Sequence, residues 1–210
     1  MKTVVSGLTR QCVAAVGVLL ALTVLLGVAY PAAVWAVSRV GAGSAEGSQL
    51  VDARGCAIGS SLIGVDPHVP AGQPDPYLHA RVLGSADNPM APGDPAASAA
   101  SNKGPGNEDL KAWIDARRSI IARREGVPPS AVPADAVTGS GSGLDPDISQ
   151  AYAAVQVPRI ARTNGLSEQQ VRAIVDRNTS ARQWGFLGES RVNVMKVNLA
   201  LGRTAPSCHR

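Results

Sequence analysis

The residues most able to do chemistry lie in the Ser–Gly run at 138–146, TGSGSGLDP. Alternating Ser and Gly can turn successive backbone N–H groups toward an anion. A phosphate-binding Walker loop ends in Gly-Lys-Ser/Thr, however, and this run contains no lysine. A nucleophile elbow has serine at the centre of Gly-x-Ser-x-Gly, and the centre of the 139–143 run is Gly141. The run therefore predicts either a tight turn before a helix that starts at Asp145-Pro146, or a structured contact.

We interpret residues 138–149 as a structured contact or ligand-sensing loop rather than a passive linker. The glycines permit φ > 0 and close approach of another backbone. Pro146 presets its own φ and restricts the residue before it. A merely flexible linker needs neither feature. The candidate contact residues of this run are Ser142, Gly143, Leu144 and Asp145.

One alternative function is a membrane-anchored serine hydrolase. It would use Ser142 or Ser61 with His79 and Asp145. The three side chains would have to converge, and neither serine lies in a nucleophile elbow. A second alternative is an anchored module that binds a solute or the cell wall through its own pocket. We assign no catalytic residue.

The histidines and cysteines predict no metal site. His68, His79 and His209 form no HxH or HxxxH pair, and the chain has no CxxC pair. We expect His79 to have a structural hydrogen-bonding role. Cys56 and Cys208 could pair in an oxidising compartment, but the sequence does not place them within bonding distance.

The elements that must position these residues begin with an apolar block. Residues 13–37 form 25 residues without a charge, and about 20 residues suffice to cross a bilayer as a helix. Tyr30 and Trp35 lie near its far end, where aromatic rings settle at the lipid–water interface. The alternative is a cleaved signal peptide, whose apolar region is shorter, about 7–15 residues. We expect a retained single transmembrane helix in the plasma membrane.

The charges that flank this helix predict its orientation. Lys2 and Arg10 lie in the short N-terminus, residues 1–12, and Arg39 is the one nearby positive charge after the span. Positive flanks stay in the cytoplasm. We therefore expect a cytoplasmic N-terminus, a tether at residues 38–50 and an extracytoplasmic domain beyond it.

The remaining charge is nearly balanced and excludes a nucleic-acid partner. Without Lys2 and Arg10, the chain has 18 basic residues against 16 acidic ones. The basic residues are scattered and form no patch interleaved with aromatic residues. We therefore expect no nucleic acid among the partners, and membrane lipid around the apolar helix.

Residues 51–210 are expected to form one small α+β domain. Two apolar runs around Arg54-Gly55 predict a strand pair, and residues 77–82, YLHARV, predict another strand. Residues 83–107 are rich in Pro, Gly, Ala and Ser, and predict a long loop that is either disordered or ordered by a partner. A helix is expected over 108–125, with most of its arginines facing away from its apolar side.

The C-terminal half continues with a second loop, two helices and a strand. After the loop at 127–148, Ser149 is expected to cap a helix that Pro158 kinks or breaks. Ser167 and Gln170 predict a capping box for the next helix, with Val171, Ile174 and Val175 facing inward. Residues 191–201, RVNVMKVNLAL, are rich in β-formers and predict a final strand. This mixture of helices and strands indicates an α+β class.

Taken together, these segments resemble the C subunit of the Kdp potassium-transporting P-type ATPase of bacteria, over nearly the whole chain and in the same order. The matching motifs are the single N-terminal span with Tyr30-Pro31, GSSLIG at 59–64, YLHAR at 77–81, SNKGP at 101–105, VPADAVT at 132–138 with SGSGLDPDIS at 140–149, QVPRIA at 156–161, GFLGE at 185–189 and RVNVMKVNLAL at 191–201.

This resemblance implies a non-catalytic accessory subunit of a high-affinity, ATP-driven potassium import complex. Its partners would be an ATP-hydrolysing subunit and a potassium-channel-like subunit. The family's C subunit is needed for assembly and is described as a catalytic chaperone that raises the ATP affinity of the hydrolysing subunit. No tightly bound cofactor is expected, although ATP is expected as a transient ligand in the complex.

The resemblance also gives the candidate residues a more specific meaning. Ser142, Gly143, Leu144 and Asp145 become candidates for a nucleotide-related or partner contact, and Gln156 joins them as a polar residue one helix later. The expected orientation conflicts with a direct ATP contact, because ATP is cytoplasmic and the domain is expected outside. Coupling between distant sites through the membrane would reconcile the two.

Overall fold

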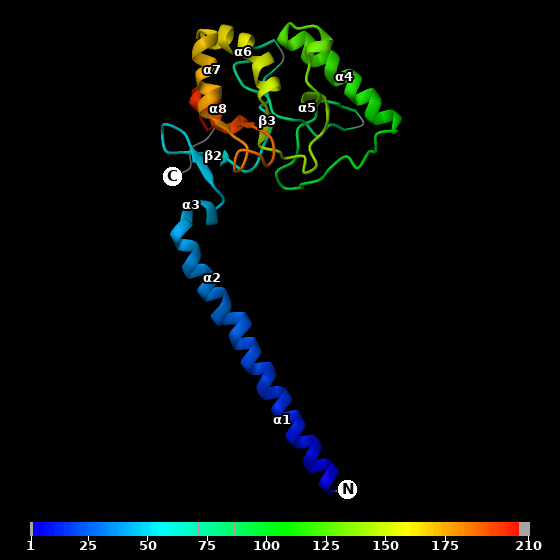
Figure 1. Ribbon diagram of the computed structural model, residues 1–210, viewed down its shortest axis with the longest axis vertical. Coiled ribbons are helices and arrows are strands. Elements are labelled where there is room, and N and C mark those ends of the chain that lie inside the picture. The colour runs from blue at the N-terminus through cyan, green and yellow to red at the C-terminus, as the bar shows by residue number, and fades with distance from the viewer. Residues whose placement is uncertain (1, 71, 86, 206–210) are drawn as a thin grey trace. The chain divides into compact units, whose positions relative to one another are not determined.

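The computed structural model describes residues 2–70, 72–85 and 87–205 (Figure 1). It divides into two compact units, residues 1–48 and 49–210. The first unit contains helical segments in unbroken succession. These are α1 (Lys2–Val24), a π-helical segment (Leu25–Ala29), α2 (Tyr30–Ser38), a 3₁₀ turn (Arg39–Gly41) and α3 (Ala42–Ala45).

The π-helical segment lies just before a proline. Pro31 has no N–H, so the carbonyl of Gly27 loses the donor that a regular α-helix would supply. A local shift to wider hydrogen bonding accommodates such a break without ending the helix. Residues 6–45 are the one stretch in the described part of the chain that is long and apolar enough to cross a membrane. The predicted span at 13–37 lies within this stretch.

The second unit is a small α+β domain, as expected. Its sheets have two and three short strands, and both are antiparallel, in the orders β1-β2 and β3-β5-β4. The elements are β1 (Gln49–Val51), β2 (Ala57–Ser60), α4 (Glu108–Glu125), a 3₁₀ turn (Pro129–Ala131), α5 (Ala134–Val137), β3 (Asp147–Ser149), α6 (Gln150–Asn164), α7 (Glu168–Arg177), β4 (Thr179–Ser180), β5 (Arg191–Asn193) and α8 (Val194–Ala200).

The predicted strand pair around Arg54-Gly55 is confirmed as the hairpin of β1 and β2. The buried carboxylate of Asp52 organises its turn by accepting hydrogen bonds from the backbone N–H groups of Arg54 and Cys56. It also accepts from the N–H of Ala205 at 3.0 Å, which holds the end of the described chain against the hairpin. These hydrogen bonds lower the pKa of Asp52 well below its usual range, against the opposing effect of burial. The sequence left open whether Cys56 pairs with Cys208, and Cys208 lies outside the described residues.

Capping residues mark the starts of the three long helices of this unit and the ends of α4 and α6, as the sequence predicted. Asn107 caps α4, and Gly126 ends it in the left-handed conformation. Ser149 caps α6, and its C-terminal stop is Gly165. The capping box of Ser167 with Gln170 is formed at the start of α7. Local side-chain hydrogen bonds to orphan backbone groups explain why these boundaries could be predicted.

Pro158 was expected to kink or break its helix, and it lies inside α6 without ending it. Two other element predictions were wrong. Residues 77–82 form no strand. Residues 191–201 are a strand only to Asn193, after which α8 begins, because the Asn193 side chain accepts from the N–H of Lys196 and caps a helix. Burial of Val194 and Val197 on one helical face outweighs their β-propensity.

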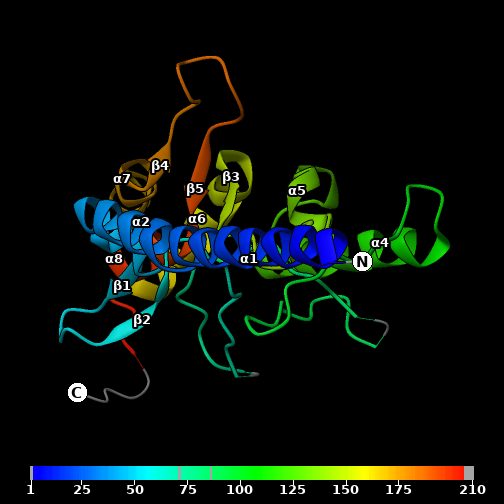
Figure 2. The ribbon, with the colours of Figure 1, turned by 90° about the horizontal axis from the view of Figure 1, so that it is seen from below.

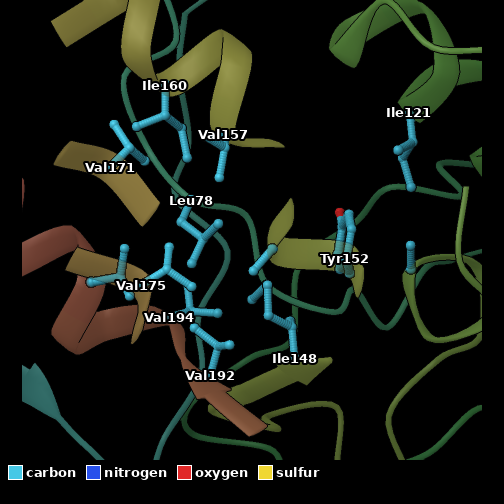
Figure 3. Close-up of a cluster of buried hydrophobic side chains, with 14 of the residues drawn as sticks. Leu78, Ile121, Ile148, Tyr152, Val157, Ile160, Val171, Val175, Val192 and Val194 are labelled. Carbon is cyan, nitrogen blue, oxygen red and sulfur yellow. The ribbon is translucent and has the colours of Figure 1, made fainter. Parts of the chain in front are cut away.

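The core gathers apolar side chains from α4, α5, α6, α7, β5 and the extended segment at 77–82. In Figure 3, Leu78 lies between Val157 and Ile160 of α6 on one side and Val175 and Val194 on the other. The side chains predicted to face inward from α7 are among them. An extended segment thus supplies the centre of the core without belonging to a sheet.

Side-chain amides replace strand neighbours along this segment. Asn198 accepts from the N–H of Leu78 at 2.7 Å and donates to its carbonyl at 2.9 Å. Gln156 likewise accepts from the N–H of His79 at 2.8 Å and donates to its carbonyl at 3.2 Å. Because buried backbone groups must be paired, two amides from α6 and α8 stabilise a strand-like backbone where no strand is available.

Candidate functional site

The Ser–Gly run is a packed junction. The carbonyl of Ser142 accepts hydrogen bonds from the N–H of Ala99 and the hydroxyl of Ser98, both at 3.0 Å. The carbonyl of Leu144 accepts from the N–H of Gly64 at 2.8 Å. Segments near positions 64 and 98 therefore meet at this run, which supports its interpretation as structured.

Glycine is required here because backbones approach closely. A Cβ built on Gly143, which has φ +70°, would lie 2.7 Å from the carbonyl oxygen of Ala99. A Cβ on Gly64 would collide with the backbone of Asp145, and one on Gly93 would collide with that of Gly143. Gly141 has no atom within 4 Å of such a Cβ. The close approaches thus belong to three positions from three separate segments.

Ion pairs fix the exit from the run. Asp145 pairs with Arg81 at 2.8 Å, and Asp147 pairs with Arg191 of β5 at 2.9 Å. These residues line a cavity of about 360 Å³, together with Asp135 and Glu189. Asp135 accepts from the hydroxyl and the N–H of Ser149, so it adds to the cap of α6. Each acidic group of this cavity already has a partner in the chain, which does not favour a free cation site.

Of the candidate contact residues, Ser142 alone is well exposed. Gly143 and Leu144 are buried, and Asp145 is half-buried in its ion pair. Gln156 is 0% exposed, and its amide is used by His79, Tyr152 and Arg159. Gln156 therefore has a structural role in the folded chain, and its nucleotide-related or partner contact stays a prediction.

His79 lies in a buried network of charges. Its Nδ1 is 2.9 Å from Asp66 and its Nε2 is 2.6 Å from Asp75. Burial by itself lowers the pKa of His79, but the hydrogen bonds to both carboxylates outweigh it and raise this pKa above its usual value. Burial raises the pKa of Asp75, but His79 and Arg159 outweigh it and lower this pKa to about 2. With both ring nitrogens engaged, His79 is not available as the base for Ser61 or Ser142.

The network continues to the C-terminal end of α4. Arg159 of α6 donates to Glu125 at 2.9 Å and to the carbonyls of Asp75 and Tyr77. Arg124 donates to the second oxygen of Glu125 at 2.6 Å. A buried carboxylate at a helix C-terminus is unfavourable by itself, and two arginines compensate it. His79, bound to two carboxylates of this network, thus has the structural hydrogen-bonding role that the sequence predicted.

Sequence reasoning missed the buried arginines. Most arginines of α4 were expected to face away from its apolar side, yet Arg117 is 1% exposed and donates to the carbonyls of Leu83, Pro89 and Val137. Its position gave a signal: it follows Ile114 by three residues and precedes Ile121 by four, on the apolar side of the helix. An arginine within the apolar stripe of a helix is thus a candidate for a buried donor to backbone carbonyls, as Arg117 is here.

No group of three or more His, Cys, Asp or Glu side chains in the described ranges is arranged to hold a metal ion. The described residues therefore offer a packed junction, a buried ionic network and a membrane-type helix. Together they define a membrane-associated chain with a small α+β domain.

Comparisons with known proteins identify the family. A family model described as K+-transporting ATPase, c chain, matches residues 12–203. A potassium-transporting ATPase KdpC subunit from Kineococcus radiotolerans is 42% identical and covers 98% of this chain and 100% of its own. Those of Streptomyces coelicolor and Mycobacterium tuberculosis H37Rv are 39% and 41% identical, covering 96% and 92% of this chain and 96% and 98% of their own. The chain belongs to the KdpC family and is an accessory subunit of a potassium transport complex.

Proposed function

We propose that the chain assembles with an ATP-hydrolysing subunit and a potassium-channel-like subunit, and raises the ATP affinity of the former without catalysing a reaction itself. The observation that carries this proposal is the family match, which includes both the apolar helix and the α+β domain. The buried, fully engaged His79 supports a non-catalytic role, because it removes the base of the rival hydrolase.

The effect on ATP acts by coupling between distant sites and not by a nucleotide bound to this chain. Gly143, Leu144 and Gln156 are buried, and the Gln156 amide is used by His79 and Arg159. The positive charges before the helix favour a cytoplasmic N-terminus and an extracytoplasmic domain, on the opposite side from ATP. The Ser–Gly run then serves to shape the domain that its partners contact.

The test compares the purified complex with one assembled without this chain. The KM for ATP is expected to rise when the chain is absent and to recover when it is added back. Photolabelling of the intact complex with azido-ATP is expected to mark the ATP-hydrolysing subunit alone. Labelling of this chain at residues 142–145 would overturn the coupling mechanism, and an unchanged KM would overturn the chaperone role.

The orientation has its own test. An exported reporter fused after Arg210 is expected to be active, and a cytoplasmic reporter at the same point inactive. The opposite pattern would place the domain in the cytoplasm.

A further inference from the structure

The connection between β4 and β5 carries an exposed apolar tip, residues 182–189, which we call the tip loop. Figure 2 shows it in orange, extending beyond the neighbouring helices of the domain. Trp184 is 84% exposed, Phe186 69% and Leu187 43%. Two aromatic side chains this exposed, within three residues, are not needed for the core of their own domain.

The backbone of the tip loop is held in one conformation. Gln183 and Leu187 exchange two hydrogen bonds of 2.9 Å, and Arg182 pairs with Glu189 at 3.3 Å across its base. Trp184 has φ +53°, a left-handed conformation that costs a bulky residue about 1–2 kcal/mol. The fold thus keeps a strained aromatic residue at the tip although its side chain is 84% exposed there. Strain of this kind is found at functional sites.

A fixed tip fits a shaped protein pocket better than lipid. A bilayer accepts apolar side chains from any backbone conformation, whereas a pocket rewards a preorganised one. The charges near the tip loop also favour a protein pocket over lipid. Arg182 pairs with Glu189 and Arg191 pairs with Asp147, so neither arginine is a free cation for anionic headgroups.

The size of the tip loop suits a partner that is already nearby. Three such side chains bury on the order of 500 Å², whereas a stable interface between free proteins needs about 800 Å² from each side. The tip loop alone is therefore too small to hold a second copy of this chain in solution. A subunit anchored in the same membrane is held at high effective concentration, so a small anchor adds specificity there.

We propose that the tip loop is a docking anchor that inserts Trp184 and Phe186 into an apolar pocket on another subunit of the same ATPase. This inference rests on the proposed assembly function. Aromatic side chains that fill pockets typically dominate the binding energy of an interface. The anchor gives the contact surface of this chain a location that the Ser–Gly run, largely buried, does not provide.

The direct test is photocrosslinking in the intact complex with Trp184→p-benzoylphenylalanine. The expected product is an adduct between this chain and another ATPase subunit, identified by mass spectrometry. Leu62→p-benzoylphenylalanine is the matched control, because Leu62 is 62% exposed on the same domain. An adduct with lipid only, a dimer of this chain only, or equal crosslinking from position 62 would each overturn the proposal.

The second test separates the anchor from the assembly function. The double variant Trp184→Ser/Phe186→Ser is expected to retain partner subunits at least tenfold less well during purification, while the Tm of the chain stays unchanged. Leu62→Ser is expected to leave retention unchanged. If the double variant retains its partners fully while deletion of the whole chain still prevents assembly, the anchor is wrong and the proposed function stands.

Discussion

At the residue scale, His79 shows how a titratable group can serve structure alone. It is clamped between Asp66 and Asp75, near the arginines at positions 124 and 159. The two carboxylates favour the charged imidazolium more than burial disfavours it. A protonated His79 therefore belongs to the folded state. Its deprotonation would remove the cation that pairs with Asp66 and would leave Asp75 with Arg159.

The sign of the resulting pH dependence follows from the raised pKa. Stability from His79 is fully present below its unfolded pKa of about 6.5 and is lost as pH rises through the higher folded pKa. Chemical unfolding of the purified chain from pH 6 to 9 should show wild type losing more stability than His79→Gln. Equal losses for the two proteins would show that His79 is not charged in the fold.

Gly143 allows the sharpest single-residue comparison. Gly143→Val places a Cβ 2.7 Å from the Ala99 carbonyl at φ +70°, so we expect a loss of several kcal/mol of stability, impaired complex assembly and unaltered membrane insertion. Gly141→Val, two residues away in open space, should cost less than about 1 kcal/mol. Thermal unfolding and co-purification measure both effects. A normal complex with Gly143→Val would make the run a linker after all.

At the element scale, the loop at 83–107 depends on α4. The sequence left two possibilities for it, disorder or ordering by a partner. The structure shows another source of order: Arg117 donates to two of its carbonyls, and Ser98 and Ala99 bind the Ser–Gly run. Arg117 of α4 and the Ser–Gly run thus both bind the loop at 83–107, which has no helix or strand of its own in the described residues.

Removal of the Arg117 guanidinium should release this loop. Arg117→Met keeps much of the side-chain volume but leaves three carbonyls without a donor, so we expect a loss of about 3 kcal/mol or more. Arg123→Met, at an exposed position of the same helix, should change stability by less than about 0.5 kcal/mol. Limited proteolysis should cut at 83–107 faster in the first variant. Equal cleavage rates would show that the loop is held by other contacts.

At the scale of the whole molecule, the apolar helix and the α+β domain are separate compact units with different tasks. The first has its apolar side chains exposed, as a helix does when lipid or other helices are to cover it. The second has its own core and buried polar network. Assembly requires both if the domain must be held beside partners in one membrane.

Residues 41–210 expressed alone should therefore be soluble but unable to support growth at limiting potassium. The reason is the loss of effective concentration at the membrane, without loss of the domain fold. Growth of a strain lacking this chain is the readout, with the full-length chain as the control and circular dichroism as a check on folding. Full complementation by the fragment would show that the helix is dispensable.

The sequence by itself determined the features that depend on near neighbours. Caps such as Ser149 and Gly165, the capping box at Ser167 and the apolar run at 13–37 each act within a few residues or along one helix, so their patterns could be read directly. The tertiary structure decided the features whose partners are remote. Residues 77–82 are held by amides 77 and 120 residues away, and Arg117 binds carbonyls 20 to 34 residues away. A buried hydrogen bond satisfies a backbone group wherever its partner lies in the chain, so only the folded arrangement could show which polar residues turn inward.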